Sequence, residues 1–412
     1  MDDLRQELSR IHREDSRRIL ATLVRLLGDW ELAEDALQDA FAEALAKWPV
    51  QGIPGNPRAW LVSAGRFRAI DKIRRGRIFA PLPEGFDELL VAPHDESSEP
   101  EFLELPDDRL RMVFTCCHPA LSEEARLALT LREVCGLTTE SIAAAFLVPA
   151  STVAQRIVRA KAKICDARIP FQVPEGSQLQ ERLDAVLQVV YLVFSEGYHS
   201  SRRVDLLRID LTIDALRLGE LLLELIPDEE VKGLMALMLF QDSRRTARVD
   251  AAGDLVLLEQ QDRSLWNRLA IERGQKLVDE AFASGRVGPY ALQAAIASLH
   301  AAATTAASTD WPQIAGLYQV LRRSSPSPVV DLNAAVAEGM ANGAEVGLRR
   351  VDALLAEGML VGYSPTHSAR AAFLEKLGRV EEARLAWKSA LALVTEDGAQ
   401  RRFLERKIAD LG

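Results

Sequence analysis

The sequence has few of the residues that build disulfide frameworks, metal sites and nucleotide-binding loops. Its four cysteines have no CxxC spacing, and its six histidines have no paired-ligand spacing such as HExxH. Neither a GxxxxGK loop nor a GxGxxG loop is present. In the run Cys116-Cys117-His118, neighbouring side chains of a helix point in different directions, so we predict a core or helix-end role. We therefore expect no metal, no cofactor, no catalytic residues and no disulfides.

Long hydrophobic runs are also missing. The most apolar windows, at 186–194 and 234–240, are much shorter than the roughly 20 residues of a membrane-spanning helix. The N-terminus has no basic, apolar and small-residue leader. These features predict a cytoplasmic protein with reduced cysteines and no membrane contact.

The residues that are present favour helices. Of 412 residues, 48% are apolar and only 6% aromatic, with abundant Ala and Leu. The length suffices for several domains. We predict an all-α protein, in which two small helical domains, the second a helix-turn-helix, are joined by an acidic linker and followed by a large α-helical repeat-like domain.

The net charge of −10 argues against nucleic-acid binding only when the chain is taken as a whole. Residues 58–77 carry seven bases against one acid, and a second basic stretch lies at 156–168. Between them, residues 81–108 carry ten acids, no Lys or Arg, and five prolines, which predicts an extended acidic linker at 79–108. Two basic helices are thus expected on either side of an acidic tether.

Three or four helices are predicted before the linker. A helix over 4–27 ends at Gly28, and Asp29 is the expected N-cap of an amphipathic helix over 30–48 with an acidic outer face. Prolines and glycines predict a loop over 49–57. In the next helix, a buried seam is predicted at Leu61, Gly65, Ala69 and Ile73. Its displaced basic face suits phosphates and an unstacked base; the alternative is a solvated face with an Asp71–Arg75 pair.

After the linker, three short helices predict a helix-turn-helix. The first begins at Ser122 and closes at Gly136, Thr138 caps the second, and the third runs from Pro149 to about Asp166. In the third, the expected inward stripe is Val153, Ile157, Ala160 and Ile164. The outward residues are Ser151, Thr152, Gln155, Arg156, Arg159 and Lys163. Such groups suit base edges and phosphates in a major groove; the alternative is a packed helix pair without DNA.

In this order, the motifs resemble the extracytoplasmic-function (ECF) group of bacterial RNA polymerase sigma factors, in the sigma-70 family. Residues 33–41 are similar to that family's polymerase-binding helix, 57–75 to its minus-10 helix, and 127–164 to its minus-35-binding helix-turn-helix. The resemblance implies a region 2 domain at 1–78, a region 4 domain at 109–169, and a non-enzymatic protein that directs promoter recognition and melting in transcription initiation.

The resemblance also assigns partners and residues. Binding of core RNA polymerase, through the clamp helices of its beta and beta-prime subunits, is assigned to Glu34, Asp35, Leu37, Gln38 and Phe41. Minus-10 DNA is assigned to Asn56, Arg66, Arg68, Lys72, Arg74 and Arg75, with Asn56 capturing a flipped base. Minus-35 DNA is assigned to Ser151, Thr152, Gln155, Arg156 and Arg159. The acidic linker is expected to thread towards the polymerase active-site channel.

The remaining residues, 172–412, read as helices throughout. A weak repeat aligns 332–356 with 368–393 at an offset of 37, which predicts tetratricopeptide-like hairpins near 329–395. The chain resembles a sigma-factor subgroup with such an extension, which implies that the extension regulates activity and has an unknown protein or small-molecule partner. Whether it inhibits or supports activity stays open.

A protein of another class would share some of these features. A free-standing operator-binding regulator with a ligand-sensing helical-repeat domain would explain the helix-turn-helix and the extension. It would not explain the acidic-faced helix followed by a basic one. An enzyme in the extension ranks third, because no substrate class is indicated.

Overall fold

The computed structural model describes residues 2–76, 107–146, 148–199, 206–250, 254–394 and 398–412. Over these residues the elements are helices, and the one β-type pairing is an isolated bridge between Val249 and Leu255. The prediction of an all-α protein is confirmed. The chain divides into two compact units, 1–189 and 190–412.

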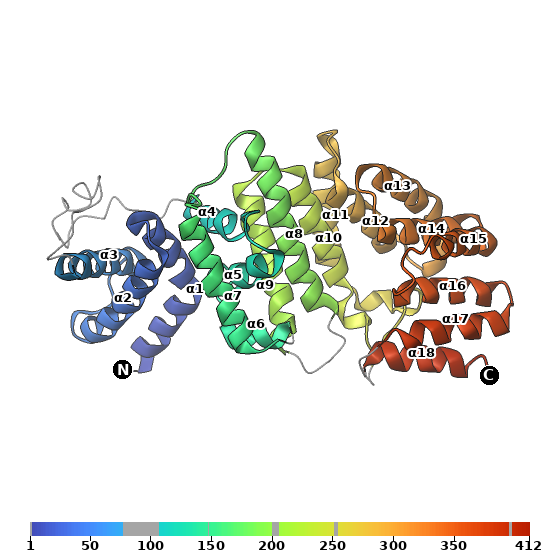
Figure 1. Cartoon of the computed structure of the whole chain (residues 1–412), viewed down its shortest axis with the longest axis horizontal. Helices are drawn as coiled ribbons and strands as arrows, with labels where there is room; N and C mark the ends of the chain where they lie inside the picture. The colour runs from blue at the N-terminus through green and yellow to red at the C-terminus, as the bar shows by residue number, and fades with distance from the viewer. Residues whose placement is uncertain (1, 77–106, 147, 200–205, 251–253, 395–397) are drawn as a thin grey trace. The chain divides into compact units, whose positions relative to one another are not determined.

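The first unit opens with α1 (Asp2–Leu27), α2 (Trp30–Gln51) and α3 (Pro57–Gly76), which pack on one another (Figure 1). Asp29 caps α2 as predicted, since its carboxylate accepts from the Leu32 amide at 2.9 Å. The loop was predicted over 49–57, but it begins later, because α2 continues through Pro49 to Gln51. A proline in the last turn removes one backbone donor without ending the helix there.

Close packing between α2 and α3 depends on Gly65. A Cβ at this position would lie 2.9 Å from the Ala36 carbonyl oxygen. The predicted seam is buried at Leu61, Gly65 and Ala69, while Ile73 is only partly buried. Small residues thus allow the two backbones to approach.

The second half of the first unit contains α4 (Asp107–Cys116), α5 (Glu123–Glu133), α6 (Thr139–Ala145) and α7 (Ala150–Asp166). Ser122 caps α5 and the Thr138 hydroxyl accepts from the Ser141 amide, as predicted. Helix α4 had not been predicted. It includes Asp107 and Asp108, which the sequence had suggested were the end of the linker; residues 77–106 lie outside the described part.

Helix α8 (Ser177–His199) contributes residues to both units, because the division falls between residues 189 and 190. The second unit continues with α9 (Leu206–Leu225), α10 (Glu229–Ser243), α11 (Arg268–Ala283), α12 (Pro289–Ala302) and α13 (Trp311–Ser324). Helix α10 is buried almost all round and packs on α9, α11 and α12.

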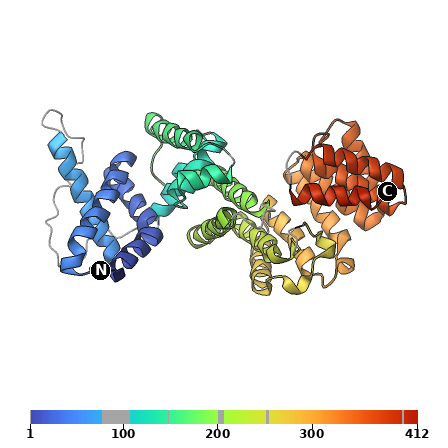
Figure 2. The same cartoon turned by 90° about the horizontal axis from the view of Figure 1, so that it is seen from below.

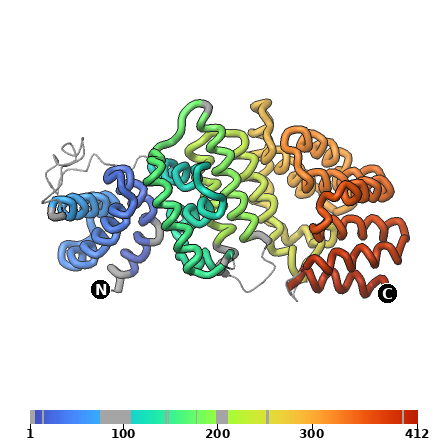
Figure 3. Tube along the Cα trace, in the orientation of Figure 1, coloured from blue at the N-terminus to red at the C-terminus, as the bar shows by residue number. Residues whose placement is uncertain are grey.

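The unit ends with two helix hairpins and a final helix. The hairpins are α14 (Pro328–Asn342) with α15 (Ala344–Ala356) and α16 (Ser364–Lys376) with α17 (Val380–Ala392); α18 (Ala399–Ala409) packs on α17 (Figures 2 and 3). Helix α16 begins 36 residues after α14, and α17 begins 36 residues after α15. The predicted offset of 37 is therefore wrong by one: it pairs exposed Ala353 with buried Ala390, whereas an offset of 36 pairs Val351 with Trp387, both buried.

Candidate functional site

The acidic face of α2 is engaged in contacts along much of its length. Of the five residues expected to bind polymerase, Gln38 is exposed and Leu37 is buried. The Phe41 ring meets His12 of α1 edge-on, with ring centroids 5.0 Å apart. Asp35 pairs with Lys72 of α3. Glu34 is half-buried and lies 2.7 Å from the Lys161 ammonium.

The basic face of α3 lies beside the acidic face of α2. Arg68 Nε donates to Glu43 at 2.7 Å. That hydrogen bond raises the pKa of Arg68, just as the Asp35 carboxylate raises the pKa of Lys72, so both side chains stay charged. Because Arg68 and Lys72 remain exposed, phosphates can compete for these cations at the surface.

The other residues expected at minus-10 DNA differ in their exposure. Asn56 is exposed and caps α3, where its side-chain oxygen accepts from the Ala59 amide at 3.1 Å. Arg74 is exposed. Arg66 is only 7% exposed and burial lowers its pKa, so it lies beneath the basic face. The side chain of Arg75, and with it the alternative Asp71–Arg75 pair, lies outside the described part.

Helix α7 has two distinct faces. Its buried residues are the predicted stripe of Val153, Ile157, Ala160 and Ile164. Of the predicted outward residues, Ser151, Gln155 and Arg159 are exposed, and Thr152 and Arg156 are partly exposed. The helix therefore presents hydroxyl, amide and guanidinium groups on one open face.

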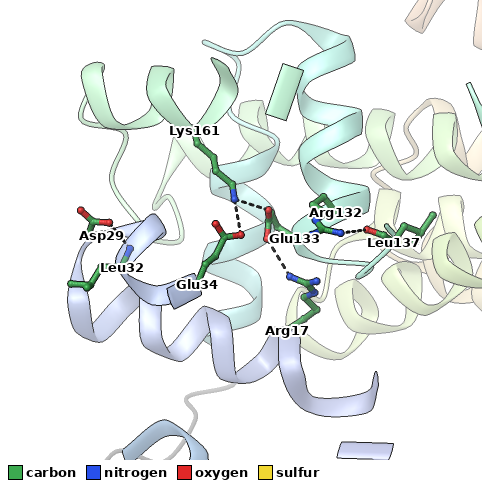
Figure 4. Close-up of polar contacts among 8 residues, drawn as sticks. All are labelled: Arg17, Asp29, Leu32, Glu34, Arg132, Glu133, Leu137 and Lys161. Atoms are coloured by element: carbon green, nitrogen blue, oxygen red, sulfur yellow. Dashed lines mark hydrogen bonds and ion pairs between the residues drawn. The ribbon is translucent and has the colours of Figure 1, made fainter. Parts of the chain in front are cut away.

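Ion pairs join residues of four helices (Figure 4). No pattern in the sequence predicts them. Glu133, fully buried in α5, receives Arg17 of α1 at 3.3 Å on one oxygen and Lys161 of α7 at 3.0 Å on the other. Lys161 also reaches Glu34 of α2 and lies over the Trp30 ring. Glu34 and Lys161 are 127 positions apart, and no periodicity relates them.

The described residues lack a metal site and a membrane-spanning helix. No group of three or more His, Cys, Asp or Glu there is placed to hold a metal, and no helix there is long and apolar enough to cross a bilayer. Cys116 and Cys117 are buried in the core at the end of α4, as predicted.

Known families match three parts of the chain. Residues 11–78 match Sigma-70 region 2, residues 111–164 match Sigma-70 region 4, and residues 182–282 match a family of unknown function (DUF6596). The two sigma modules occur in the order expected from the sequence. Together with the helical fold, they define the class: a sigma-70-type initiation factor with a helical extension.

Curated relatives include two that are named as ECF sigma factors and one that is uncharacterized. An uncharacterized protein of Rhizobium meliloti (strain 1021) is 45% identical over 91% of this chain and 89% of its own length. The "Probable ECF RNA polymerase sigma factor SigI" of Mycobacterium tuberculosis is 30% identical over 36% of this chain, which spans 51% of that relative. The "ECF RNA polymerase sigma factor SigE" of Mycolicibacterium smegmatis is 31% identical over 37% of this chain, which spans 58% of that relative. No solved structure matches.

The chain belongs to the ECF group of the sigma-70 family and carries a C-terminal extension that contains the DUF6596 region. It acts in transcription initiation, with core RNA polymerase and promoter DNA as its partners.

Proposed function

We propose that the two sigma modules divide promoter recognition between α2, α3 and α7. Helix α2 binds the clamp helices of the beta and beta-prime subunits, the Asn56 loop and α3 hold the melted minus-10 strand, and α7 reads minus-35. The chain itself performs no covalent chemistry, because its work is to place polymerase on DNA and to hold the opened strand.

Support for the minus-10 surface comes from exposure and charge. Arg68, Lys72 and Arg74 are exposed cations in the C-terminal half of α3, and exposed Asn56 directly precedes the first turn of the same helix. Buried Arg66 is assigned here a packing role within the region 2 module. Released counterions favour binding of a strand to exposed cations, and an amide edge at the other end of the helix can hydrogen-bond an unstacked base.

The observation that carries the proposal is the open polar face of α7 in a chain that also contains the α2–α3 module. The face has Ser151 and Gln155 near the helix N-terminus and Arg159 two turns further on. Short polar groups near the N-terminal end of a recognition helix reach base edges, whereas longer cations also reach phosphates.

The test is run-off transcription with purified core polymerase. The full chain is expected to yield promoter-specific transcripts, and core polymerase alone should yield none. Failure at every promoter, together with tight binding of duplex operator without polymerase, would instead support the free-standing regulator.

We also propose that the extension controls the activity of the sigma modules, and that its 36-residue hairpins are tetratricopeptide-like. Helix α8 supports control, because Arg182 Nη2 donates to the Phe114 carbonyl of α4 at 2.7 Å within the first unit. Further along the same helix, Tyr191 meets Tyr290 edge-on, and both of these residues belong to the second unit. Repeated hairpins form extended surfaces that suit a protein or small-molecule partner. Transcript yields of chains with and without 200–412 test the proposal, and equal yields would refute control.

A further inference from the structure

The end of α10, the residues before α11 and the end of α12 lie together in the second unit. The Asn267 amide donates to the carbonyl of Ser243, the last residue of α10, at 2.9 Å. Arg263 opens the short 3-10 helix η4 (Arg263–Leu265), and its Nη1 donates to the carbonyls of His300 and Ala303, at the end of α12, at 2.6 and 2.7 Å. Three arginines at these contacts are here called the arginine junction: Arg244, which follows Ser243, Arg263, and Arg268, which follows Asn267.

The guanidinium groups of the arginine junction repel one another. Burial, and then the positive charges of Arg244 and Arg268, lower the pKa of Arg263. Burial and the charges of Arg244 and Arg263 likewise lower the pKa of His300. The carbonyls at the end of α12 offset this repulsion only in part, because a helix C-terminus carries roughly half a negative charge. An anion at this place would therefore be attracted by several positive charges at once.

The carboxylates nearest in the chain have partners of their own. Asp242 pairs with an arginine three positions later. The Asp262 carboxylate accepts from an amide of η4 at 2.9 Å. Asp254 pairs with two arginines of α18. In the described part of the chain, no carboxylate forms an ion pair with Arg263 or Arg268, so these two cations can bind an external anion.

A buried indole N–H lies beside the arginine junction. Trp266 is 3% exposed, and its Nε1 has no acceptor among the described residues. A buried donor without an acceptor costs about 1–3 kcal/mol, and native proteins rarely leave one unless water or an ion accepts from it. The Arg263 guanidinium carbon lies 4.5 Å from the centre of the Trp266 ring. An anion held by Arg263 could therefore also accept from the indole.

The remaining donors suit a tetrahedral oxyanion. Arg263 uses Nη1 for the two carbonyls of α12, and its Nε and Nη2 donate to no described residue. Arg268 is exposed at the first position of α11, where the helix N-terminus adds positive potential. A phosphate group has enough oxygens for the indole N–H and both guanidinium groups at once, whereas a carboxylate has only two. These donors thus favour a phosphate group over a carboxylate.

We propose that the arginine junction binds the phosphate group of a small phosphorylated compound, with Arg263, Arg268 and the Trp266 indole as its donors. Leu265 and Asn267, on either side of Trp266, are exposed, so a small compound can enter from the surface. The backbone of duplex DNA fits less well, because a rigid duplex reaches only exposed groups and Trp266 is almost fully buried. This inference deepens the proposed control by the extension and rests on it only for an effect on transcription.

The test is a titration of the full-length chain at constant ionic strength, followed by the NMR signals of the indole N–H groups. The chain has six tryptophans, and Trp266→Phe identifies the signal of Trp266. Inorganic phosphate and glycerol phosphate are expected to move this signal, with a Kd of about 1 mM or less. Chloride, and a short DNA duplex at the same concentration of phosphate groups, should leave the signal in place.

Arg268→Gln is the test variant, and Arg323→Gln is its matched control. Both arginines are exposed and neither forms an ion pair with a described residue, but Arg323 lies in α13. Arg268→Gln should weaken phosphate binding about tenfold through the loss of a charge-assisted hydrogen bond. Arg323→Gln should bind phosphate as the wild type does. Arg263 is left unchanged because it holds the end of α12, and circular dichroism verifies the fold of each variant.

The outcomes separate the phosphate site from the proposed control. A Trp266 signal that stays in place in phosphate, or equal weakening by both substitutions, would overturn the site. So would a signal that moves equally with chloride, or that moves only with DNA. If phosphate moves the signal but the transcript yield is the same with and without residues 200–412, the proposed control fails and the phosphate site stands.

Discussion

Protonation of His300 opposes the fold of the second unit. Burial, and then the positive charges of Arg244 and Arg263, lower the pKa of His300 to about 4. The ring meets Trp311 edge-on at 5.2 Å, and Arg263 donates to the His300 carbonyl at 2.6 Å. The folded state thus binds this proton more weakly than the unfolded chain does.

The sign of the pH effect follows from that difference. Stability that is fully present above pH 6.5 is lost as the pH falls towards 4, because the unfolded chain takes up the proton first. Between pH 7 and pH 5, the loss due to His300 should be about 2 kcal/mol. Urea unfolding of the wild type and of His300→Gln measures it. Equal losses in both proteins would contradict the assignment.

Substitution of one arginine on each proposed DNA surface can distinguish the two surfaces. Arg74 of α3 is exposed, and Arg156 of α7 is partly exposed. Arg74→Ala should lower open-complex formation and leave polymerase affinity nearly intact, because the residues proposed to bind polymerase lie in α2. Arg156→Ala should weaken dependence on the minus-35 sequence by roughly 1–3 kcal/mol if it contacts a base. Each variant is the control for the other in permanganate footprinting and in transcription from promoters with altered minus-35 sequences. The same defect in both variants would refute the division.

At the scale of the element, close helix packing in the hairpin of α14 and α15 leaves little room for a side chain at one glycine. A Cβ at Gly347 in α15 would lie 2.3 Å from the Phe373 ring and 2.8 Å from the Gly339 Cα. Gly347→Ala should therefore lower the free energy of unfolding by about 1–3 kcal/mol through overpacking.

Gly316→Ala is the matched control. Gly316 lies in helix α13 with nothing within 4 Å of its added Cβ, so alanine there should stabilise by up to about 1 kcal/mol through helix propensity. Urea unfolding of both variants gives the two signs. A stabilising effect at Gly347 would show that the hairpin accommodates the methyl group.

Local chemistry made most elements predictable. Asp29, Ser122 and Thr138 mark helix starts by short-range hydrogen bonds, and the stripe in α7 follows the helical period. Helix α4 was missed because its first residues are acids that continue the linker's charge pattern. There, the Asp108 carboxylate accepts hydrogen bonds from Thr22 and Arg25, which lie more than 80 residues earlier. The predicted repeat offset of 37 residues is wrong by one residue, because both copies contain many alanines and these alanines align at several offsets.

At the scale of the whole molecule, the charge of −10 conceals local arrangements that the sequence predicted only in part. The basic face of α3 and the polar face of α7 follow from spacing within one helix. The ion pairs of Glu43 with Arg68 and of Glu34 with Lys161 depend on how helices pack. Those contacts, and the burial of Arg66, were therefore beyond the sequence pattern.

The last prediction concerns how the extension acts on the sigma modules. If α8 transmits control, its continuity is required, because Arg182 in its first part contacts α4 within the first unit, and Tyr191 in its second part meets Tyr290 within the second unit. Two glycines inserted between Val189 and Val190 add flexible backbone at the division of the units. The insertion should change the transcript yield in the same direction and to a similar extent as removal of 200–412.

The control is the same insertion after Gly285, an exposed position between α11 and α12 with nothing within 4 Å of an added Cβ. It should leave the transcript yield at the wild-type value, because both ends of α8 keep their contacts. Unfolding curves verify that each unit remains folded. Wild-type yield from the 189/190 insertion, with an altered yield on removal of 200–412, would mean that the extension acts without α8, through a surface of its own.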